Sequence, residues 1–278
     1  MSARVIPPEL EIDPEAVAES LELFVRQQVH DQGFTRVVLG LSGGVDSAVV
    51  AALCTRALGP RNVSALLLPY KTSADASRED ALAVADGLDL TTENMDITSL
   101  ADAYFEGRGL DALRKGNVLA RLRMVVIFDT AKKLGALVAG TGNKTETWLG
   151  YSTWYGDSAC SFLPIGDLYK TQVWQLAVWL NLPVSVITKD PSADLWPGQT
   201  DEGELGIRYA EADRILHALL DRGLSPADVV ADGFLRERVE TVVKQIKATQ
   251  FKRELPPVAR LSAEFPDPSR ILDYDAFS

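Results

Sequence analysis

The feature that most restricts the fold of this sequence is an apolar segment that leads directly into a glycine turn and a helix. Residues 37–41 (VVLGL) have the continuous apolar character of a short buried strand. Residues 42–47 (SGGVDS) follow at once, and residues 48–58 then have helical composition up to a Gly-Pro pair. A glycine turn that opens a helix offers free backbone N–H groups to an anion. The segment therefore predicts an α/β protein with an anion site at the end of a strand.

Strands and helices continue to alternate along the chain. Residues 63–68, 91–97 and 136–141 are further predicted strands. Helices are predicted at residues 14–30, 77–88, 117–134, 171–180, 209–220 and 236–253. We therefore expect an α/β fold with an open, mostly parallel, doubly wound sheet and helices on both faces. Because one core can serve 278 residues, we expect residues 1–278 to form a single domain with a proline-containing tail from about residue 254.

Composition excludes several classes of protein. The chain has 28 Lys and Arg against 39 Asp and Glu, and the net charge of -11 opposes binding to a nucleic-acid backbone. No segment approaches the ~18 apolar residues of a membrane span, and residues 1–8 lack the pattern of a secretory signal. We therefore expect a cytoplasmic protein with neither a nucleic-acid nor a membrane partner.

The few cysteines and histidines exclude further types of site. Cys54 and Cys160 have no paired spacing, so neither a disulfide framework nor a cysteine-rich zinc site is predicted. Cys54 lies in an apolar helical segment and is a predicted core residue. His30 and His217 lie in amphipathic helical segments, where surface positions are expected. A histidine-dependent catalytic triad is therefore not predicted.

The composition of the turn at residues 42–47 indicates what anion it binds. Gly43 and Gly44 let the backbone approach a polyphosphate, and Ser42 and Ser47 offer hydroxyl donors. Asp46 would repel phosphate unless it holds a magnesium ion that bridges to the phosphates. The alternative is an ordinary Ser-Gly-Gly turn in which Asp46 is merely favourable in the first helical turn. The complete pattern favours a metal-bound nucleotide.

The segment SGGVDS resembles the pyrophosphate-binding loop of the ATP pyrophosphatases, which cleave ATP between the α and β phosphates. It lacks the Gly-Lys-Ser/Thr ending of a Walker sequence, so adenylyl transfer is implied and γ-phosphoryl transfer is not. Four later segments resemble NAD synthetase motifs in the right order: GNVLARLRM (116–124), GTGNKTE (140–146), PIGDLYKT (164–171) and PSADLWPGQTDEGELG (191–206). The resemblance covers most of residues 20–255 and implies an adenine nucleotide alpha hydrolase-like fold.

The resemblance implies roles for individual residues. Asp46 and Glu146 would hold Mg²⁺, and Asp46 and Lys170 would act in catalysis. The residues that would hold ATP are Gly40, Leu41, Ser42, Gly43, Gly44, Val45, Asp46, Ser47, Thr141, Lys170 and Ser192. Thr141 and Glu146 follow a predicted strand, where ligands of open α/β sheets collect. Lys170 has an alternative interpretation as a surface lysine at the start of a helix.

The resemblance also implies that Arg121 contacts deamido-NAD, and the other predicted substrate-binding residues are Asn117, Trp154 and Lys252. Asn117 and Arg121 are four residues apart on an apolar helix, so Arg121 needs an anionic partner. A dinucleotide phosphate is favoured over an internal salt bridge.

Three positions depart from the family pattern on this side. Trp154 stands where many members have lysine, Ser161 where they have aspartate, and Phe251 precedes Lys252 in place of histidine. Trp154 and Tyr155 are therefore candidates for stacking on the nicotinate ring or for a dimer contact.

The predicted helix at residues 117–134 is apolar on nearly every side, which predicts burial on more than one face. It is either a central helix of one core, which the pattern slightly favours, or a helix that meets its symmetry mate in a homodimer. A homodimer is the predicted assembly.

The predicted reaction is ATP-dependent adenylation of the nicotinate carboxylate of deamido-NAD, followed by displacement of AMP by ammonia. Neither cysteine lies in the context of a glutaminase nucleophile, so the predicted nitrogen donor is free ammonia or a separate partner protein that supplies it. Residues 190–206, rich in Gly and Asp, are a candidate lid that is mobile without ligand. The rival hypotheses are a tRNA-modifying adenylating enzyme and a nucleotide-binding module without catalysis.

Overall fold

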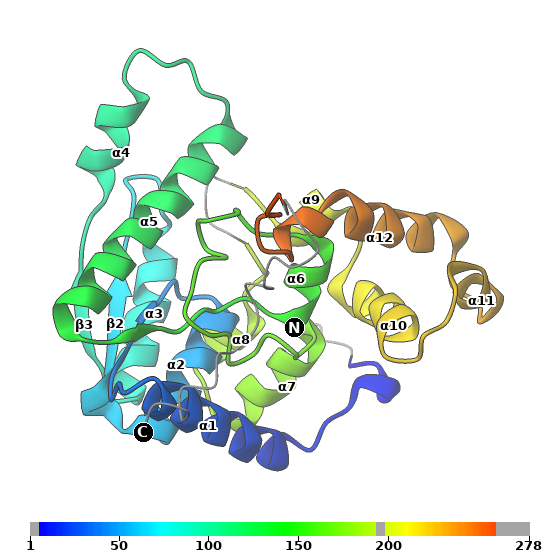
Figure 1. Cartoon of the computed structure of the whole chain (residues 1–278), viewed down its shortest axis with the longest axis horizontal. Helices are drawn as coiled ribbons and strands as arrows, with labels where there is room; N and C mark the ends of the chain where they lie inside the picture. Colours follow the sequence, from blue (N-terminus) through cyan, green and yellow to red (C-terminus); the bar gives the residue numbers. More distant parts are fainter. Residues whose placement is uncertain (1–5, 193–197, 260–278) are drawn as a thin grey trace.

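The computed structural model describes residues 6–192 and 198–259 of the chain. At its centre lies a four-stranded sheet in the order β3-β2-β1-β4, in which every strand pairing is parallel (Figure 1). The strands are β1 (Val37–Gly40), β2 (Val63–Leu67), β3 (Thr91–Asn94) and β4 (Leu137–Val138). In register, Val37 lies opposite Val63 on one side and Leu137 on the other. The predicted parallel α/β architecture is confirmed.

The helices of the described residues fall before, between and after these strands. They are α1 (Pro14–Asp31), α2 (Val45–Leu58), α3 (Asp75–Gly87), α4 (Thr98–Phe105), α5 (Ala112–Leu134), α6 (Lys144–Leu149), α7 (Lys170–Trp179), α8 (Val184–Thr188), α9 (Asp201–Leu205), α10 (Tyr209–Leu220), α11 (Pro226–Ala231) and α12 (Arg236–Ala248). Short 3₁₀ turns are η1 (Pro8–Leu10), η2 (Pro60–Asn62) and η3 (Gln250–Lys252). Within the two described stretches, no helix combines the length and apolar character needed to cross a lipid bilayer.

Alternation along β1 explains why this strand is apolar at every position. Val37 and Leu39 belong to a core cluster shared with α1, α2 and α7, whereas Val38 belongs to a second cluster with residues of α4 and α5. Successive side chains of a strand point to opposite faces. Both faces of the sheet are therefore covered by helices, as expected for parallel strands.

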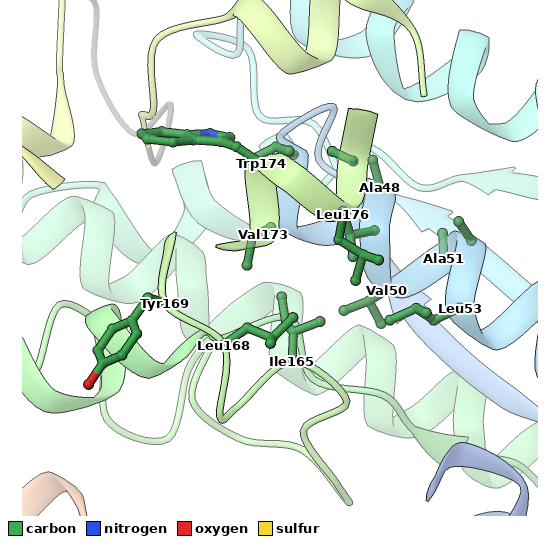
Figure 2. Packing of buried hydrophobic residues seen from close by; sticks show 14 of the residues in the cluster. Ala48, Val50, Ala51, Leu53, Ile165, Leu168, Tyr169, Val173, Trp174 and Leu176 are labelled. Carbon is green, nitrogen blue, oxygen red and sulfur yellow. The ribbon is translucent and has the colours of Figure 1, made fainter. Parts of the chain in front are cut away.

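The core on the α2 side joins the turn after β1 to a later segment of the chain. Figure 2 shows Val50 and Leu53 of α2 close to Ile165 and to Leu176 of α7. Cys54 is fully buried in the same cluster, as predicted. This packing fixes the start of α7 relative to the start of α2.

The order of the strands creates a topological switch point between β1 and β4. The chain proceeds from β1 to β2 and β3 on one side, then returns to β4 on the other side of β1. The loops that follow β1 and β4 therefore diverge, and ligands of open α/β sheets bind at such a switch point. Residues 41–44 and 139–143 form these two loops.

Element boundaries differ from the predictions where caps decide them. α2 begins at Val45 instead of residue 48, and α5 begins at Ala112 because Asp111 caps its N-terminus by accepting from the backbone N–H of Arg114. α12 ends at Ala248, earlier than predicted. The short helices α4, α6, α8, α9 and α11 were not predicted, because too few turns are present to show a period.

The prediction that α5 is buried on more than one face is wrong for the single chain. Leu119 and Ala131 of α5 are buried against the sheet, but Val125 is 56% exposed and Phe128 is 37% exposed. α5 lies in the outer layer of the molecule (Figure 1). The explanation as a central helix of one core is therefore not supported, and an apolar face of α5 stays open.

Candidate active site

The turn after β1 has a backbone that only glycine accommodates at Gly43. Gly43 has a φ of +78°, and a Cβ there would overlap the carbonyl oxygen of Ser77 in α3. The turn is held by its own serines: the backbone N–H of Ser42 donates to Oγ of Ser47 at 3.2 Å, and Oγ of Ser47 donates to the carbonyl of Gly44 at 3.0 Å. α2 starts directly after it, so the first N–H groups of the helix are left for a ligand.

The other predicted ATP-binding residues of this turn differ in what they can offer. The side chains of Leu41 and Val45 are buried in the core, so these residues can contribute only backbone groups. Gly40 ends β1 and packs close to Ile127 of α5. Oγ of Ser42 lies 3.1 Å from Oγ of Ser47 at the exposed edge of the turn.

Asp46, Glu146 and Lys170 meet beside the loops that follow β1 and β4. Nζ of Lys170 lies 2.5 Å from Oδ2 of Asp46 and 3.1 Å from Oε1 of Glu146. Lys170 is only 2% exposed. The three residues stand in the first turns of α2, α6 and α7, and the alternative of a surface lysine is excluded.

Asn143, which was not predicted as a site residue, orients both carboxylates. It is the N-cap of α6: its Oδ1 accepts from the backbone N–H of Glu146 at 2.9 Å, and its own N–H donates to the Glu146 side chain. Nδ2 of Asn143 donates to Oδ1 of Asp46 at 2.9 Å. Its place in the segment GTGNKTE was the one signal in the sequence that could have found it.

Burial and mutual charge set the electrostatics of this trio. Burial raises the pKa of Glu146 to about 8; Lys170 opposes this shift and Asp46 adds to it. Burial disfavours the charged form of Lys170, but Asp46 and Glu146 outweigh burial, so the pKa of Lys170 is raised. The lysine is therefore held as a cation, chiefly by Asp46, beside the more weakly acidic Glu146.

The donor set around Asp46 and Glu146 fits a magnesium ion that is bound together with phosphates. In the described part of the chain, no group of three or more His, Cys, Asp and Glu residues is arranged to hold a metal. Mg²⁺ does not need such a cage, because it is commonly held by one or two carboxylates, substrate phosphates and water. Asp46 and Glu146 supply two such carboxylates, and they are near each other because both contact Nζ of Lys170.

A group of tyrosines and acids that sequence reasoning missed lines the same site. Nζ of Lys170 lies 5.1 Å from the ring centre of Tyr209, whose hydroxyl donates to Asp201 at 3.1 Å. The hydroxyl of Tyr151 donates to Asp201 at 3.0 Å and to Glu204 at 2.5 Å. Burial raises the pKa of Asp201, and Lys170 opposes the shift. Asp201 and Glu204 lay within a quoted motif, but nothing in the sequence singled out the tyrosines.

The four predicted substrate residues gather around the loop at residues 150–155. Oδ1 of Asn117 accepts from Oγ1 of Thr153 at 2.9 Å, and Nη2 of Arg121 donates to the carbonyl of Trp154 at 3.1 Å. Nζ of Lys252 donates to the carbonyls of residues 150 and 152 at 2.7 and 2.6 Å. Asn117, Arg121 and Lys252 therefore all bind the loop to which Trp154 belongs.

The aromatic residues near this loop pack on one another, whereas Arg121 is exposed. Trp154 stacks on Tyr155 with ring centres 4.4 Å apart and meets Phe251 edge-on at 5.2 Å. Arg121 is exposed, and within residues 6–192 and 198–259 no ion pair involves it, so the alternative of an internal salt bridge gains no support. Ser161 is bound to the backbone of β4 at Val138.

The remaining predicted residues lie at the borders of the site. Thr141 is partly buried in the loop after β4, where it was expected. Ser192 is exposed at the end of a described stretch, and residues 193–197 of the predicted lid lie outside the described residues. The rest of that segment includes α9, in which Asp201 and Leu205 are buried. The mobility of the lid stays a prediction.

The family model for NAD synthase matches residues 17–256. The chain belongs to the NAD synthase family. The NH3-dependent NAD+ synthetase of Fusobacterium nucleatum is 44% identical over 253 residues, which are 91% of this chain and 98% of that protein. The protein of the same name from Chlorobaculum parvum is 46% identical over 261 residues, 94% of each chain. The family resemblance of the sequence motifs is confirmed.

Solved structures of NAD synthase relatives share the fold. The NMN synthetase of Francisella tularensis matches with a TM-score of 0.80 and 31% identity, over 90% of this chain and 99% of its own. The NH3-dependent NAD synthetase of Campylobacter jejuni, solved with a nitrate ion, matches with a TM-score of 0.77 and 34% identity, over 90% of this chain and all of its own (100%). The adenine nucleotide alpha hydrolase-like fold is thereby confirmed for the family member described here.

Proposed function

We propose that the chain is a ligase that forms a C–N bond: it adenylates the nicotinate carboxylate of deamido-NAD with ATP, and ammonia then displaces AMP. The observation that carries this function is the buried Lys170 between Asp46 and Glu146, directly beside the glycine turn. Membership of the NAD synthase family, with NH3-dependent relatives 44% and 46% identical, supports the same reaction. A nucleotide-binding module without catalysis would have no need of this trio.

The geometry supports activation of a carboxylate by ATP. Ammonia does not displace hydroxide from a carboxylate, whereas AMP is a good leaving group. The nicotinate oxygen attacks the α phosphorus, the bond from that phosphorus to the α–β bridging oxygen breaks, and the first backbone N–H groups of α2 with Lys170 stabilise the departing pyrophosphate. Mg²⁺, held by Asp46 and Glu146, would neutralise charge on the phosphates. Alignment of acid and ATP can supply roughly 7 to 11 kcal/mol in favourable cases.

We assign the binding of deamido-NAD to the loop at residues 150–155 and the groups around it. The exposed guanidinium of Arg121 suits a phosphate of the dinucleotide. Trp154 offers an aromatic surface to the nicotinate ring. Lys252 is engaged with two backbone carbonyls, so it acts by holding the loop. Burial lowers the pKa of Lys252, and Asp157 opposes that shift.

Ammonium salts, and not glutamine, are expected to support turnover. Burial raises the pKa of Cys54 to about 12 and that of Cys160 to about 11, so neither thiol forms the thiolate that a glutaminase needs. The purified chain is assayed with ATP, Mg²⁺ and deamido-NAD, and with ammonium or glutamine in turn. We expect AMP, pyrophosphate and NAD in equal amounts with ammonium only. Formation of ADP, or turnover with glutamine alone, would contradict the proposed function.

The same assay distinguishes the substrates of close relatives. Because the NMN synthetase of Francisella tularensis shares the fold, nicotinate mononucleotide is tested beside deamido-NAD. The NH3-dependent NAD+ synthetases that match this chain favour the dinucleotide as its substrate. A higher kcat/KM for the mononucleotide would reassign the substrate while leaving the chemistry in place.

We propose that the open apolar face of α5 forms a homodimer interface, for which Val125→Glu is the test. Val125 is 56% exposed on α5, and Val178 is 60% exposed on α7 and serves as the matched control. A two-fold interface would bury two copies of the introduced carboxylate. We expect light scattering to show a dimer for the native chain and for Val178→Glu, and a monomer for Val125→Glu. An unchanged dimer in Val125→Glu would exclude this interface.

A further inference from the structure

Asp213 of α10 is a fully buried carboxylate outside the site described above. It is 0% exposed, and its two oxygens accept hydrogen bonds from different helices. Oδ1 accepts from Oγ1 of Thr145 in α6 at 2.5 Å, and Oδ2 accepts from the backbone N–H of Thr171 in α7 at 2.8 Å. One side chain therefore joins the starts of two helices that come from separate parts of the chain.

These two helix starts carry Glu146 and Lys170 of the site. Thr145 immediately precedes Glu146, and Thr171 immediately follows Lys170. Oγ1 of Thr145, besides donating to Asp213, accepts the backbone N–H of Lys170 at 3.0 Å. Asp213 thus binds the residue before Glu146 and the residue after Lys170 directly. It also holds the hydroxyl that accepts the backbone N–H of Lys170.

A second carboxylate of α10 binds the same helix starts from another side. Asp221, which follows the last residue of α10, accepts from Nζ of Lys144 and from the hydroxyl of Tyr169, both at 2.8 Å. Nδ1 of His217 lies 2.9 Å from the same carboxylate. Lys144 and Tyr169 are the neighbours of Thr145 and Lys170 in sequence, so α10 spans both helix starts.

We propose that Asp213 is a positioning residue of the synthetase, which sets the separation of Glu146 and Lys170 by tying α6 to α7. This inference rests on the proposed function, in which Lys170 and Glu146 act on the phosphates and their metal. Catalytic groups must be held within about 0.5 Å of their productive positions. A displacement of about 1 Å can lower a rate by about 10²-fold.

The two hydrogen bonds explain why this position holds a carboxylate, because each of its oxygens accepts one. Burial raises the pKa of Asp213 to about 6, against the hydrogen bonds from Thr145 and Thr171. Above that pH the buried side chain is ionised, which asparagine of the same shape would avoid. The negative charge of Asp213 is stabilised by the hydroxyl of Thr145 and the backbone N–H of Thr171, and the carboxylate holds both of these donors in place.

Asp213→Asn tests the role with little change of shape. We expect kcat to fall about 10- to 100-fold with a KM for ATP that changes less than about threefold, because the glycine turn still holds the ground-state nucleotide. Thr145→Val removes the same hydrogen bond and should have an effect of similar size, whereas Thr145→Ser keeps the hydroxyl and should restore most of the rate. The double variant Asp213→Asn/Thr145→Val should be no slower than the slower single variant.

Val229→Ala is the control for loss of stability. Val229 is a fully buried residue of α11, a helix that carries none of the trio, so this variant should lower Tm without changing kcat while the protein is folded. A kcat of Asp213→Asn within twofold of native, or a loss of rate that Val229→Ala reproduces, would overturn the proposal.

A crystal structure of Asp213→Asn separates this inference from the proposed function. We expect the distance between Nζ of Lys170 and Oε1 of Glu146, here 3.1 Å, to differ between crystal structures of the variant and of the native chain. That distance is measured whether or not the native chain makes NAD. An unchanged distance in the variant would refute the positioning role, and an inactive native chain would refute the function alone.

Discussion

Replacement of Lys170 by methionine is expected to reduce the rate of AMP formation by about 10³-fold or more. Loss of one donor to developing negative charge already lowers a rate by about 10²- to 10³-fold. Lys170→Met also removes the cation that now lies 2.5 Å from Asp46 and 3.1 Å from Glu146, so the carboxylate of Asp46 faces the incoming phosphates without it. The measurement is release of AMP and pyrophosphate at saturating ATP, Mg²⁺, deamido-NAD and ammonium.

The same substitution is expected to leave a folded protein of lower stability. Removal of one partner from a buried ion pair costs about 3 to 5 kcal/mol when the other charge stays. Glu146 reduces this loss by taking up a proton, because burial has already raised its pKa to about 8 and the opposing effect of Lys170 is gone. Denaturant unfolding near pH 7 measures the difference.

The control for Lys170→Met is Lys244→Met on the outer surface of α12, which should change neither activity nor stability appreciably. A rate of Lys170→Met within tenfold of native would remove Lys170 from the catalytic machinery. If Lys170→Arg kept the native rate while Lys170→Met lost it, a positive charge alone would suffice at this position.

The strand, turn and helix at residues 37–58 could be predicted because their signals are local. A short apolar run, two glycines and a helical composition each act within a few residues. The parallel sheet followed from repetition of the pattern, and β1, β2 and β3 lie where strands were expected. Glu146 and Thr141 were placed by the general rule for strand ends.

The state of Lys170 could not be predicted from the sequence, because its burial is a property of the tertiary fold. Its partner Asp46 is 124 residues away in the chain. Nothing in the neighbourhood of a lysine at a helix start distinguishes a solvated side chain from a buried one. The family resemblance indicated the role, and packing of α7 on α2 produces it.

Burial of side chains on α5 and α10 could not be predicted from the sequence either. The apolar pattern of α5 predicted that several of its faces are buried. It could not show whether another part of the chain covers them, and Val125 and Phe128 are exposed in the single chain. Asp213 lies in a predicted helix where a carboxylate is unremarkable in sequence. Only the approach of α6 and α7 makes it a buried acceptor.

Gly43→Ala is expected to have the second largest effect, a loss of at least about 10²-fold in kcat/KM for ATP. The φ of +78° at Gly43 disfavours any side chain, at roughly 1–2 kcal/mol. A Cβ would also overlap the carbonyl oxygen of Ser77 and lie 3.2 Å from the backbone N of Ala81. These are backbone atoms of α3, so relief requires the turn to move away from the position in which its N–H groups meet phosphate.

Two other glycines separate the backbone strain from the overlap. Gly59 has a φ of +82° with nothing within 4 Å of a Cβ, so Gly59→Ala should carry the strain alone. Gly87 in α3 also has open space, without a positive φ, so Gly87→Ala should be neutral or slightly stabilising. Both variants should keep native kinetics, and ATP binding measured by calorimetry should weaken only in Gly43→Ala. If Gly43→Ala bound ATP as well as Gly59→Ala does, the close approach of the turn to α3 would not be what shapes the phosphate site.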